Sequence, residues 1–147
     1  MYLNSTVVIK RISAASEING NQFNALRDEG TEWDAEQGKK YLASEDNALF
    51  LAFIEEEIVG FLTAHRLQRL DKRKAEILLY EVSVAPDFRQ KGIGKALIDG
   101  VKKWGKEVEA DEVWVLTERS NLPAMALYQS MGGTRENSDE QMFTFKI

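Results

Sequence analysis

The chain has 147 residues, a length that favours one compact domain, residues 1–147, with a core of its own. Its formal net charge of -5 argues against a nucleic-acid surface, since phosphate binding requires a clustered excess of basic residues. The absence of cysteine excludes disulfides and thiolate metal sites, and one histidine, His65, is too few for a histidine metal site. No apolar run is long enough to cross a membrane, and Met1–Ile12 lacks a signal-peptide pattern. We therefore expect a cytoplasmic protein that uses no metal.

The N-terminal half of the sequence predicts a strand, two helices and a hairpin. Thr6–Ile12 is rich in β-branched residues, whereas the next two segments are polar with sparse apolar residues, as in amphipathic helices. Two apolar segments then lie on either side of a turn at Glu56–Glu57, with Gly60 as a candidate bulge. The predicted elements are, in chain order, Thr6–Ile12, Ser16–Glu29, Asp34–Ser44, Ala48–Glu55 and Ile58–Leu70.

The C-terminal half predicts alternating strands and helices. Glu76–Val84 is apolar on both faces, which is typical of a central strand in a sheet covered on both sides. After it we expect a helix, a strand, a second helix that begins near Asn121, and two short strands. Their ranges are Gly94–Glu109, Glu112–Thr117, Asn121–Gly132, Thr134–Glu136 and Gln141–Ile147. The whole order predicts an α/β fold with a mixed sheet and helices on both of its faces.

A loop with two glycines, Arg89-Gln90-Lys91-Gly92-Ile93-Gly94, joins the central strand to the next helix. Glycines allow backbone N–H groups to approach a ligand closely, and the first turn of a helix adds unpaired donors and a positive dipole. Such a loop either binds an anion, usually phosphate, or only shapes a turn. A P-loop would need four residues between its glycines, and a dinucleotide loop would need a third glycine where Leu97 stands. The remaining pattern is R-x-x-G-x-G.

That pattern resembles the pyrophosphate loop of the GNAT superfamily of acetyl-CoA-dependent N-acetyltransferases. The segment from Asn121 to Gly132 is similar to a second signature of the superfamily, N-x-x-A-x-x-L-Y-x-x-x-G. Within the superfamily, Phe50–Gly132 looks most like the class I aminoglycoside 3-N-acetyltransferases. The segments that carry this likeness are LLYEVSVAPDFRQKGIGKALI and PAMALYQSMG. The resemblance implies a central, mostly antiparallel sheet that is splayed at a cofactor cleft.

The same resemblance implies how acetyl-CoA is held. Backbone groups of Val82 and Val84 would bind the acetyl carbonyl and the pantetheine arm, as fixed dipoles at the developing oxyanion. Asn121 would contact the pantetheine. The pyrophosphate would lie on the loop and the first helical turn, formed by Arg89, Gln90, Lys91, Gly92, Ile93, Gly94 and Lys95.

Two side chains are candidates for proton transfer in such a reaction. Glu81 is a carboxylate on an otherwise apolar central strand, an environment that favours a general base. It could act as the base directly, relay a proton through water, or anchor the ammonium group of the acceptor. Glu76 is the alternative base, although it lies nearer the far end of the strand. Tyr128 matches the tyrosine of the superfamily and is the candidate acid toward the leaving thiolate, with a place in the core as its alternative.

The connection between the two predicted N-terminal helices is acidic. From Asp28 to Glu36 it carries five carboxylates and no basic residue. A negative rim would concentrate a cationic acceptor, but a solvated acidic loop would have the same composition. In the superfamily this connection borders the acceptor, so the candidates for substrate binding are Glu29, Glu32, Trp33 and Asp34.

We therefore expect an enzyme that moves the acetyl group of acetyl-CoA to a primary amine of a small cationic molecule, with an aminoglycoside as the favoured class. The alternatives are a polyamine, a protein or peptide amine, and a CoA-binding module without transfer activity. Glu81 and Tyr128 disfavour the last of these. No nucleic-acid or membrane partner is expected. The terminal strand with Phe143, Phe145 and Ile147 would allow pairing across a sheet edge in a homodimer.

Overall fold

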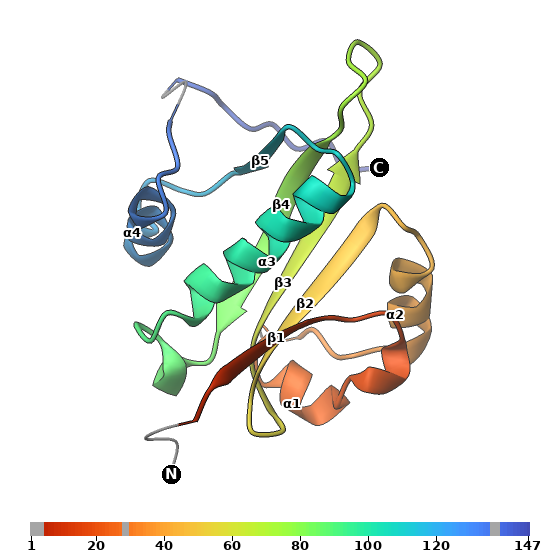
Figure 1. Ribbon diagram of the computed structural model, residues 1–147, viewed down its shortest axis with the longest axis vertical. Helices are drawn as coiled ribbons and strands as arrows, with labels where there is room; N and C mark the ends of the chain where they lie inside the picture. The colour runs from red at the N-terminus through yellow and green to blue at the C-terminus, as the bar shows by residue number, and fades with distance from the viewer. Residues whose placement is uncertain (1–4, 28–29, 136–138) are drawn as a thin grey trace. The chain divides into compact units, whose positions relative to one another are not determined.

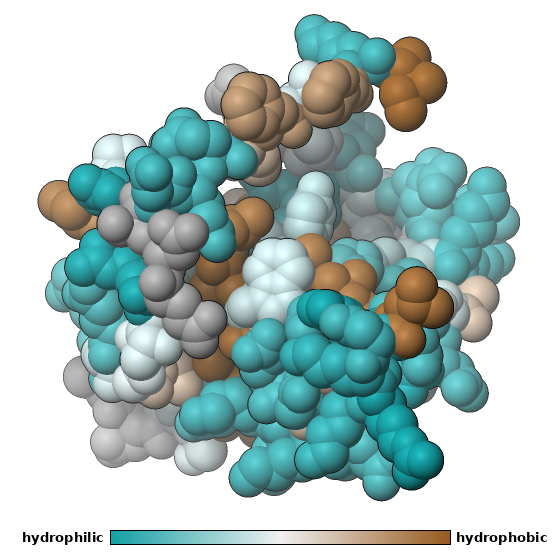
Figure 2. Space-filling model, turned by 90° about the horizontal axis from the view of Figure 1, so that it is seen from above, coloured by the Kyte–Doolittle hydropathy of each residue, from teal (hydrophilic) through white to brown (hydrophobic). Residues whose placement is uncertain are grey.

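The computed structural model describes residues 5–27, 30–135 and 139–147. The chain divides into two compact units, Met1–Leu116 and Thr117–Ile147, and each is described by itself below. The expectation of a single domain stays a prediction. No helix in the described part of the chain is long and apolar enough to cross a membrane. On the face drawn in Figure 2 hydrophilic side chains cover most of the surface, and the apolar ones form small separate groups.

A five-stranded sheet in the order β1-β2-β3-β4-β5 forms the centre of the first unit (Figure 1). Strands β1 to β4 pair antiparallel with their neighbours, and β5 lies parallel to β4. The predicted mixed sheet is thereby confirmed, and the strand Glu76–Val84 lies in its interior, as its two apolar faces indicate. The strands are β1 Val7–Arg11, β2 Asn47–Ile54, β3 Glu57–Leu67, β4 Glu76–Val84 and β5 Glu112–Val115.

One helix, α3 (Ile93–Glu107), covers one face of this sheet and contacts all five strands (Figure 1). Its buried stripe includes Leu97, Val101 and Trp104, at the helical spacing expected from the sequence. The Trp104 ring packs edge-on to Phe50 of β2, with ring centroids 6.5 Å apart. Burial of such a side chain contributes about 1.5–3 kcal/mol, so this stripe is what fixes α3 on the sheet.

Two short helices, α1 (Gly20–Asn24) and α2 (Ala35–Leu42), contact the sheet through β3 and β2. Between them and the sheet lies a cluster that includes Phe23, Leu49 and Phe61. The prediction of one helix over Ser16–Glu29 is wrong in length, because α1 is only Gly20–Asn24. A separate 3-10 turn at Ala15–Glu17 precedes α1. Asparagine side chains compete with the helical backbone for hydrogen bonds. Asn19 caps the start of α1 by accepting from the Gln22 N–H, and Asn24 at its end accepts from the Trp33 N–H.

Two irregularities in the sheet change which side chains face which layer. The β2–β3 register shifts between Ala52 and Phe53, which leaves Val59 without a partner next to the predicted bulge at Gly60. The β3–β4 register shifts between Thr63 and Ala64, which leaves Tyr80 of β4 without a partner. A bulge of this kind turns consecutive side chains toward the same face.

In the second unit, helix α4 (Leu122–Ser130) has the predicted boundaries. The Asn121 side chain accepts from the Ala124 N–H at 3.3 Å, and Gly132 ends the helix with a positive φ of 81°. The predicted strand Gln141–Ile147 is not formed, and residues 134–135 are not in a strand either; Glu136 lies outside the described residues. A strand needs a partner for its backbone groups, and no described residue pairs with this segment.

Candidate functional site

The loop before α3 has the backbone of an anion site. Gly92 is the N-cap residue of α3 in the left-handed conformation, with φ of 81°, and Gln90 also has a positive φ of 60°. No side chain caps the helix, so the first-turn N–H groups are open to a ligand. Alternation of left-handed and ordinary residues also turns successive N–H groups into one concavity. Anion binding by this loop stays a prediction, and its backbone conformation is compatible with it.

Two basic side chains of this loop, Arg89 and Lys91, contact neighbouring residues. Arg89 Nε donates to the carbonyl of Val84 at 3.1 Å, which ties the loop to the end of β4. The Lys91 ammonium lies 5.5 Å from the centre of the Phe88 ring, and the Phe88 ring is itself buried. An anion at the start of α3 would therefore meet backbone donors and fixed positive charge together.

Strand β4 continues past the end of β5 toward this loop. Their pairing runs from Glu76 opposite Glu112 to Leu79 opposite Val115 and stops there. Strand β4 continues to Val84, so Tyr80–Val84 have no pairing with β5 in the described residues. Val82 and Val84, the predicted backbone ligands, lie on this stretch. Strand β4 thus extends beyond its pairing with β5 toward the glycine loop, where the splay is predicted.

A cavity of about 590 Å³ is the second feature of the site. One wall comes from the connection between α1 and α2 and contains Glu32, Trp33 and Asp34. The opposite wall comes from the sheet and contains Thr63, His65, Tyr80 and Glu81. The structure thus brings the predicted base Glu81 together with three predicted acceptor residues. The fourth, Glu29, lies outside the described residues.

The β3–β4 bulge is what places Glu81 and Tyr80 in the same cavity. Glu81 pairs with Thr63 and Leu79 pairs with Ala64, so Tyr80 is the extra residue on β4. The Thr63 hydroxyl donates to Glu81 Oε2 at 3.2 Å and fixes that carboxylate against the sheet. Strict alternation along the strand predicts that Tyr80 and Glu81 point to opposite faces. No glycine or proline at these positions indicates the bulge, and sequence reasoning therefore missed Tyr80.

Trp33 is a rigid wall of the cavity because two glycines make room for its ring. A Cβ on Gly20 would lie 2.7 Å from Trp33 Cδ1, and a Cβ on Gly38 would overlap the indole. Phe23 packs edge-on to the same indole, with centroids 5.5 Å apart. Asp34 has a structural task beside the predicted one, since its Oδ1 accepts from the Glu36 N–H at 2.8 Å and caps α2.

An aromatic group that sequence reasoning missed completes the cavity. His65 packs edge-on to Tyr41 and to Tyr80, with ring centroids 5.6 Å apart in each pair. The Tyr41 hydroxyl donates to the carbonyls of Ala48 and Ala64. Burial raises the pKa of Tyr41 to about 12, so this phenol stays protonated. Tyr41, His65 and Tyr80 come from three different elements, and no local pattern in the sequence brings them together.

Glu76, the alternative base, does not line the cavity. It is only 6% exposed and accepts from Arg69 at 2.7 Å and from Lys72 at 3.1 Å. The hydrogen bond from Lys72 and the charge of Arg69 lower the pKa of this carboxyl group. Glu76 therefore anchors the start of β4 and is not a base.

Asn121 and Tyr128 belong to the second unit and are described within it alone. Asn121 uses its side-chain oxygen to cap α4. Tyr128 lies on the partly buried side of α4 with Ala124, Leu127 and Met131. Burial raises the pKa of Tyr128, so its hydroxyl carries its proton at neutral pH and can donate it.

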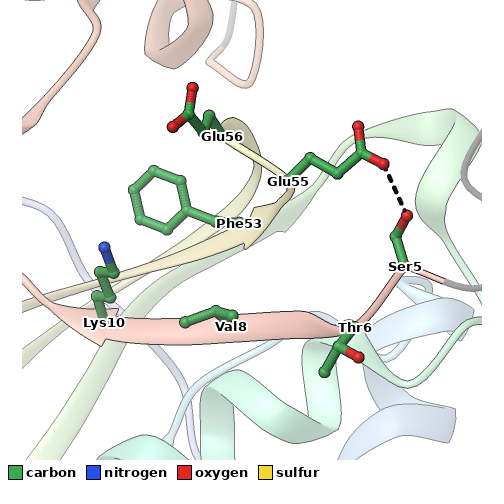
Figure 3. Close-up of a pocket in the computed structure, with 7 residues that line it drawn as sticks. All are labelled: Ser5, Thr6, Val8, Lys10, Phe53, Glu55 and Glu56. Atoms are coloured by element: carbon green, nitrogen blue, oxygen red, sulfur yellow. Dashed lines mark hydrogen bonds between the residues drawn. The ribbon is translucent and has the colours of Figure 1, made fainter.

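A second hollow of about 500 Å³ lies at the β1 edge and the β2–β3 turn (Figure 3). Its floor is Val8 and Phe53, with the Lys10 ammonium 5.3 Å from the centre of the Phe53 ring. Ser5 donates to Glu55 at 3.0 Å on its rim, as the dashed line shows. None of the predicted site residues lines this hollow, so the cavity at Glu81 is the candidate site. The described residues contain no group of three ligands suited to a metal.

Comparison with known proteins decides the family. The sequence profile of the acetyltransferase (GNAT) family matches residues 14–133, which include the loop, the cavity and α4. The chain belongs to this family. Human N-acetyltransferase 8 is 34% identical over 94 residues, which are 64% of this chain and 41% of that protein. Streptothricin acetyltransferase of Escherichia coli is 30% identical over 105 residues, 71% of this chain and 56% of that protein. This GNAT chain thus spans about 41–56% of the length of these curated relatives.

Solved structures agree with the GNAT fold. An aminoglycoside acetyltransferase from an uncultured soil metagenomic sample, in complex with trehalose, is 25% identical with a TM-score of 0.81; the match covers 95% of this chain and 97% of that one. The aminoglycoside N-acetyltransferase AAC(6')-Iy in complex with CoA has a TM-score of 0.79 at 24% identity, over 97% of this chain and 96% of that one. The predicted membership of the GNAT superfamily is confirmed. AAC(6')-Iy is an aminoglycoside acetyltransferase of the 6' type, so this neighbour does not support the predicted 3-N class in particular.

Proposed function

We propose that this chain transfers the acetyl group of acetyl-CoA to a primary amine of a small cationic acceptor, such as an aminoglycoside. The observation that carries the proposal is the cavity at the part of β4 that extends beyond β5. Three carboxylates, Glu32, Asp34 and Glu81, meet aromatic walls there. Carboxylates attract an ammonium group, and aromatic faces stabilise it further when water is excluded. Its volume also lies in the range of about 300–1,000 Å³ that is usual for small-molecule sites.

The glycine loop fits the pyrophosphate of CoA. Open N–H groups of the first turn of α3 would bind the phosphates, with Arg89, Lys91 and Lys95 adding charge. The stretch of β4 at Val82 and Val84, which pairs with β3 but not with β5, would hold the thioester beside the cavity through backbone groups. Asn121 would contact the pantetheine. The bound thioester supplies an activated acetyl group, and the protein supplies its position relative to the amine.

The reaction requires proton transfers that residues of the site would carry out. The acceptor ammonium first loses a proton, and its nitrogen then forms a C–N bond with the acetyl carbon. The C–S bond breaks, the nitrogen gives up a second proton, and the thiolate takes one. Glu81 would accept a proton directly or through water, or hold the ammonium in place, and Tyr128 would protonate the thiolate.

Relatives favour more than one acceptor class. The streptothricin and aminoglycoside acetyltransferases are named for small molecules. An N-alpha-acetyltransferase of Sulfurisphaera tokodaii, 30% identical over 100 residues, favours a peptide terminus as the second candidate. The three carboxylates of the cavity outnumber its two basic side chains, Arg27 and Lys40, and support a small cationic acceptor. The polyamine alternative shares the same electrostatics, and the 3-N position and a cytoplasmic location stay predictions.

Glu81→Gln tests this proposal because it removes a charge and changes little else. If Glu81 accepts a proton, kcat should fall by about 10²-fold or more. If it anchors the ammonium, the KM of the cationic acceptor should rise while kcat changes little. In both cases the wild-type KM should rise with salt, since the attraction is screened. Glu56→Gln, outside the cavity, is the matched control. Unchanged kinetics in Glu81→Gln, with a salt-independent KM, would contradict the proposal.

A further inference from the structure

His65 is held in one orientation by a neighbour whose own orientation is fixed. Asn47 lies directly opposite His65 on β2. Its Nδ2 donates to the carbonyl of Tyr41 near the C-terminal end of α2, at 2.9 Å. A carbonyl only accepts hydrogen bonds, so the amide nitrogen must face Tyr41 and the amide oxygen must face His65. The hydrogen bond from Asn47 to the Tyr41 carbonyl thereby determines that the amide oxygen faces the imidazole.

The imidazole meets that amide oxygen through Nδ1, at a distance of 2.8 Å. Two acceptors at this distance would repel each other, so Nδ1 must carry the hydrogen. A neutral histidine has one N–H, and the hydrogen bond of one nitrogen sets the state of the other. Neutral His65 is therefore the Nδ1–H tautomer, and Nε2 keeps a free lone pair.

That lone pair is exposed on a residue that lines the candidate cavity. Nε2 makes no hydrogen bond to any residue in the described ranges. No buried side-chain nitrogen or oxygen in that part of the chain lacks a partner, so Nε2 must reach open space. His65 lines the cavity that also contains Glu81. Thr63, which holds Glu81, lies two residues before His65 on the same face of β3, a spacing of about 7 Å.

We infer that Nε2 of His65 touches the acceptor amine and takes the proton of its ammonium group before acetyl transfer. This inference rests on the proposed function and adds a residue to its site. The N–H bond of the ammonium breaks, its electron pair stays on the acceptor nitrogen, and the lone pair of Nε2 forms the new N–H bond. Asn47 then still accepts from Nδ1 of the imidazolium, and the carboxylate of Glu81 lies in the same cavity as a counter-charge. The proton later leaves to water.

Among the groups that line the cavity, His65 suits this task best. Tyr41 is held as a donor by two backbone carbonyls and does not accept a proton. The carboxylate of Glu81 lies in the same cavity and would stabilise the ammonium and the imidazolium in turn. Imidazole groups change charge near neutral pH, which matches a base that must pick up and release a proton in each turnover. The other charged groups lining the cavity are Glu32, Asp34, Arg27 and Lys40.

Nitrogen NMR tests the tautomer without any activity, because the chain has one histidine and its spectrum contains one imidazole. In protein labelled with ¹⁵N-histidine, at a pH where the ring is neutral, we expect Nδ1 to carry the hydrogen and Nε2 to show the shift of an unprotonated nitrogen. Addition of CoA and kanamycin, a cationic aminoglycoside, should move the Nε2 resonance most. A hydrogen on Nε2, or an Nε2 resonance that kanamycin leaves unchanged, would overturn the inference.

Kinetics test the proton transfer and separate this inference from the proposed function. His65→Gln should lower kcat/KM by about 10²-fold and abolish its decline at acidic pH, with the affinity for CoA unchanged by calorimetry. Arg66→Gln, the next residue on β3 with its side chain paired to Asp46, is the control and should behave as wild type. If wild type is active and His65→Gln keeps the same rate and acidic limb, His65 is only a wall. If wild type acetylates no amine, the proposed function fails, and the NMR result still decides the tautomer and whether kanamycin reaches Nε2.

Discussion

Glu76 and Glu81 show how neighbouring groups decide the task of a carboxylate on one strand. Glu76 is buried and already accepts from two cations. Glu81 faces a cavity and accepts from the hydroxyl of Thr63. A carboxylate whose charge is balanced in the protein is a poor proton acceptor, whereas an unpaired one attracts a cation from solution. Both residues are acidic positions in the same strand pattern, so only the tertiary contacts separate their roles.

Glu76 should make stability depend on pH. Lys72 and Arg69 lower the pKa of its carboxyl group in the folded state. The ion pair therefore stabilises the fold at pH values above the unfolded pKa, and this stabilisation is lost as the pH falls through the lower, folded value. Glu76→Gln should thus reduce the free energy of unfolding at neutral pH, by an amount that shrinks below about pH 4. Urea titrations at several pH values measure this, and a difference independent of pH would contradict the assignment.

Tyr128 tests the acid side of the reaction. Burial raises the pKa of its hydroxyl, which keeps the proton available at neutral pH. Tyr128→Phe removes the donor and keeps the ring. We predict a fall in kcat of about 10²-fold with little change in the affinity for CoA, measured by calorimetry. Equal kcat values in the two proteins would return Tyr128 to a purely structural role.

At the scale of elements, Trp33 shows how two helices build one wall of the cavity. Gly38 lies inside α2, where alanine would ordinarily be better by about 1 kcal/mol. A Cβ there would overlap the Trp33 indole, however, and such overpacking costs about 1–3 kcal/mol. Gly38→Ala should therefore destabilise the fold on balance and weaken binding of the acceptor by displacing the ring.

Gly105→Ala in α3 is the matched control for this change. A Cβ on Gly105 would meet its nearest atom, Ile77 Cγ1, at 3.7 Å, an ordinary contact. This variant should be as stable as wild type or more stable, by up to about 1 kcal/mol. Thermal unfolding compares the two variants. A Gly38→Ala protein as stable as Gly105→Ala would show that Trp33 is not held as the structure indicates.

Local pattern predicts the elements better than it predicts their distortions. Strand β4 has the predicted boundaries because Pro86 follows the end of its apolar run. Helix α4 has them because Asn121 caps its start and Gly132 follows its end. The bulge at Tyr80 leaves no mark in the sequence, because it arises from pairing with β3. Helix α1 is short because Asn24 bonds to Trp33, nine residues away. Such contacts depend on tertiary structure, which overrides propensity.

For the whole molecule, two motifs in the sequence were enough to predict the fold, whereas anion binding by the glycine loop stays a prediction. The acceptor side was predicted only in part. Glu32, Trp33 and Asp34 were predicted from an acidic connection, whereas His65 and Tyr41 enter the cavity because separate elements meet there. Homodimer formation through the apolar residues of the C-terminal segment stays a prediction, which light scattering can test.

The central claim is that the chain acetylates a small cationic amine. Release of the CoA thiol from acetyl-CoA, measured with an aminoglycoside, spermidine and a basic peptide as acceptors, tests it most directly. We predict thiol release with a small polycation, a product heavier by one acetyl group, and a KM that rises with salt. No release with any of the three, from a protein that still binds CoA, would contradict the account.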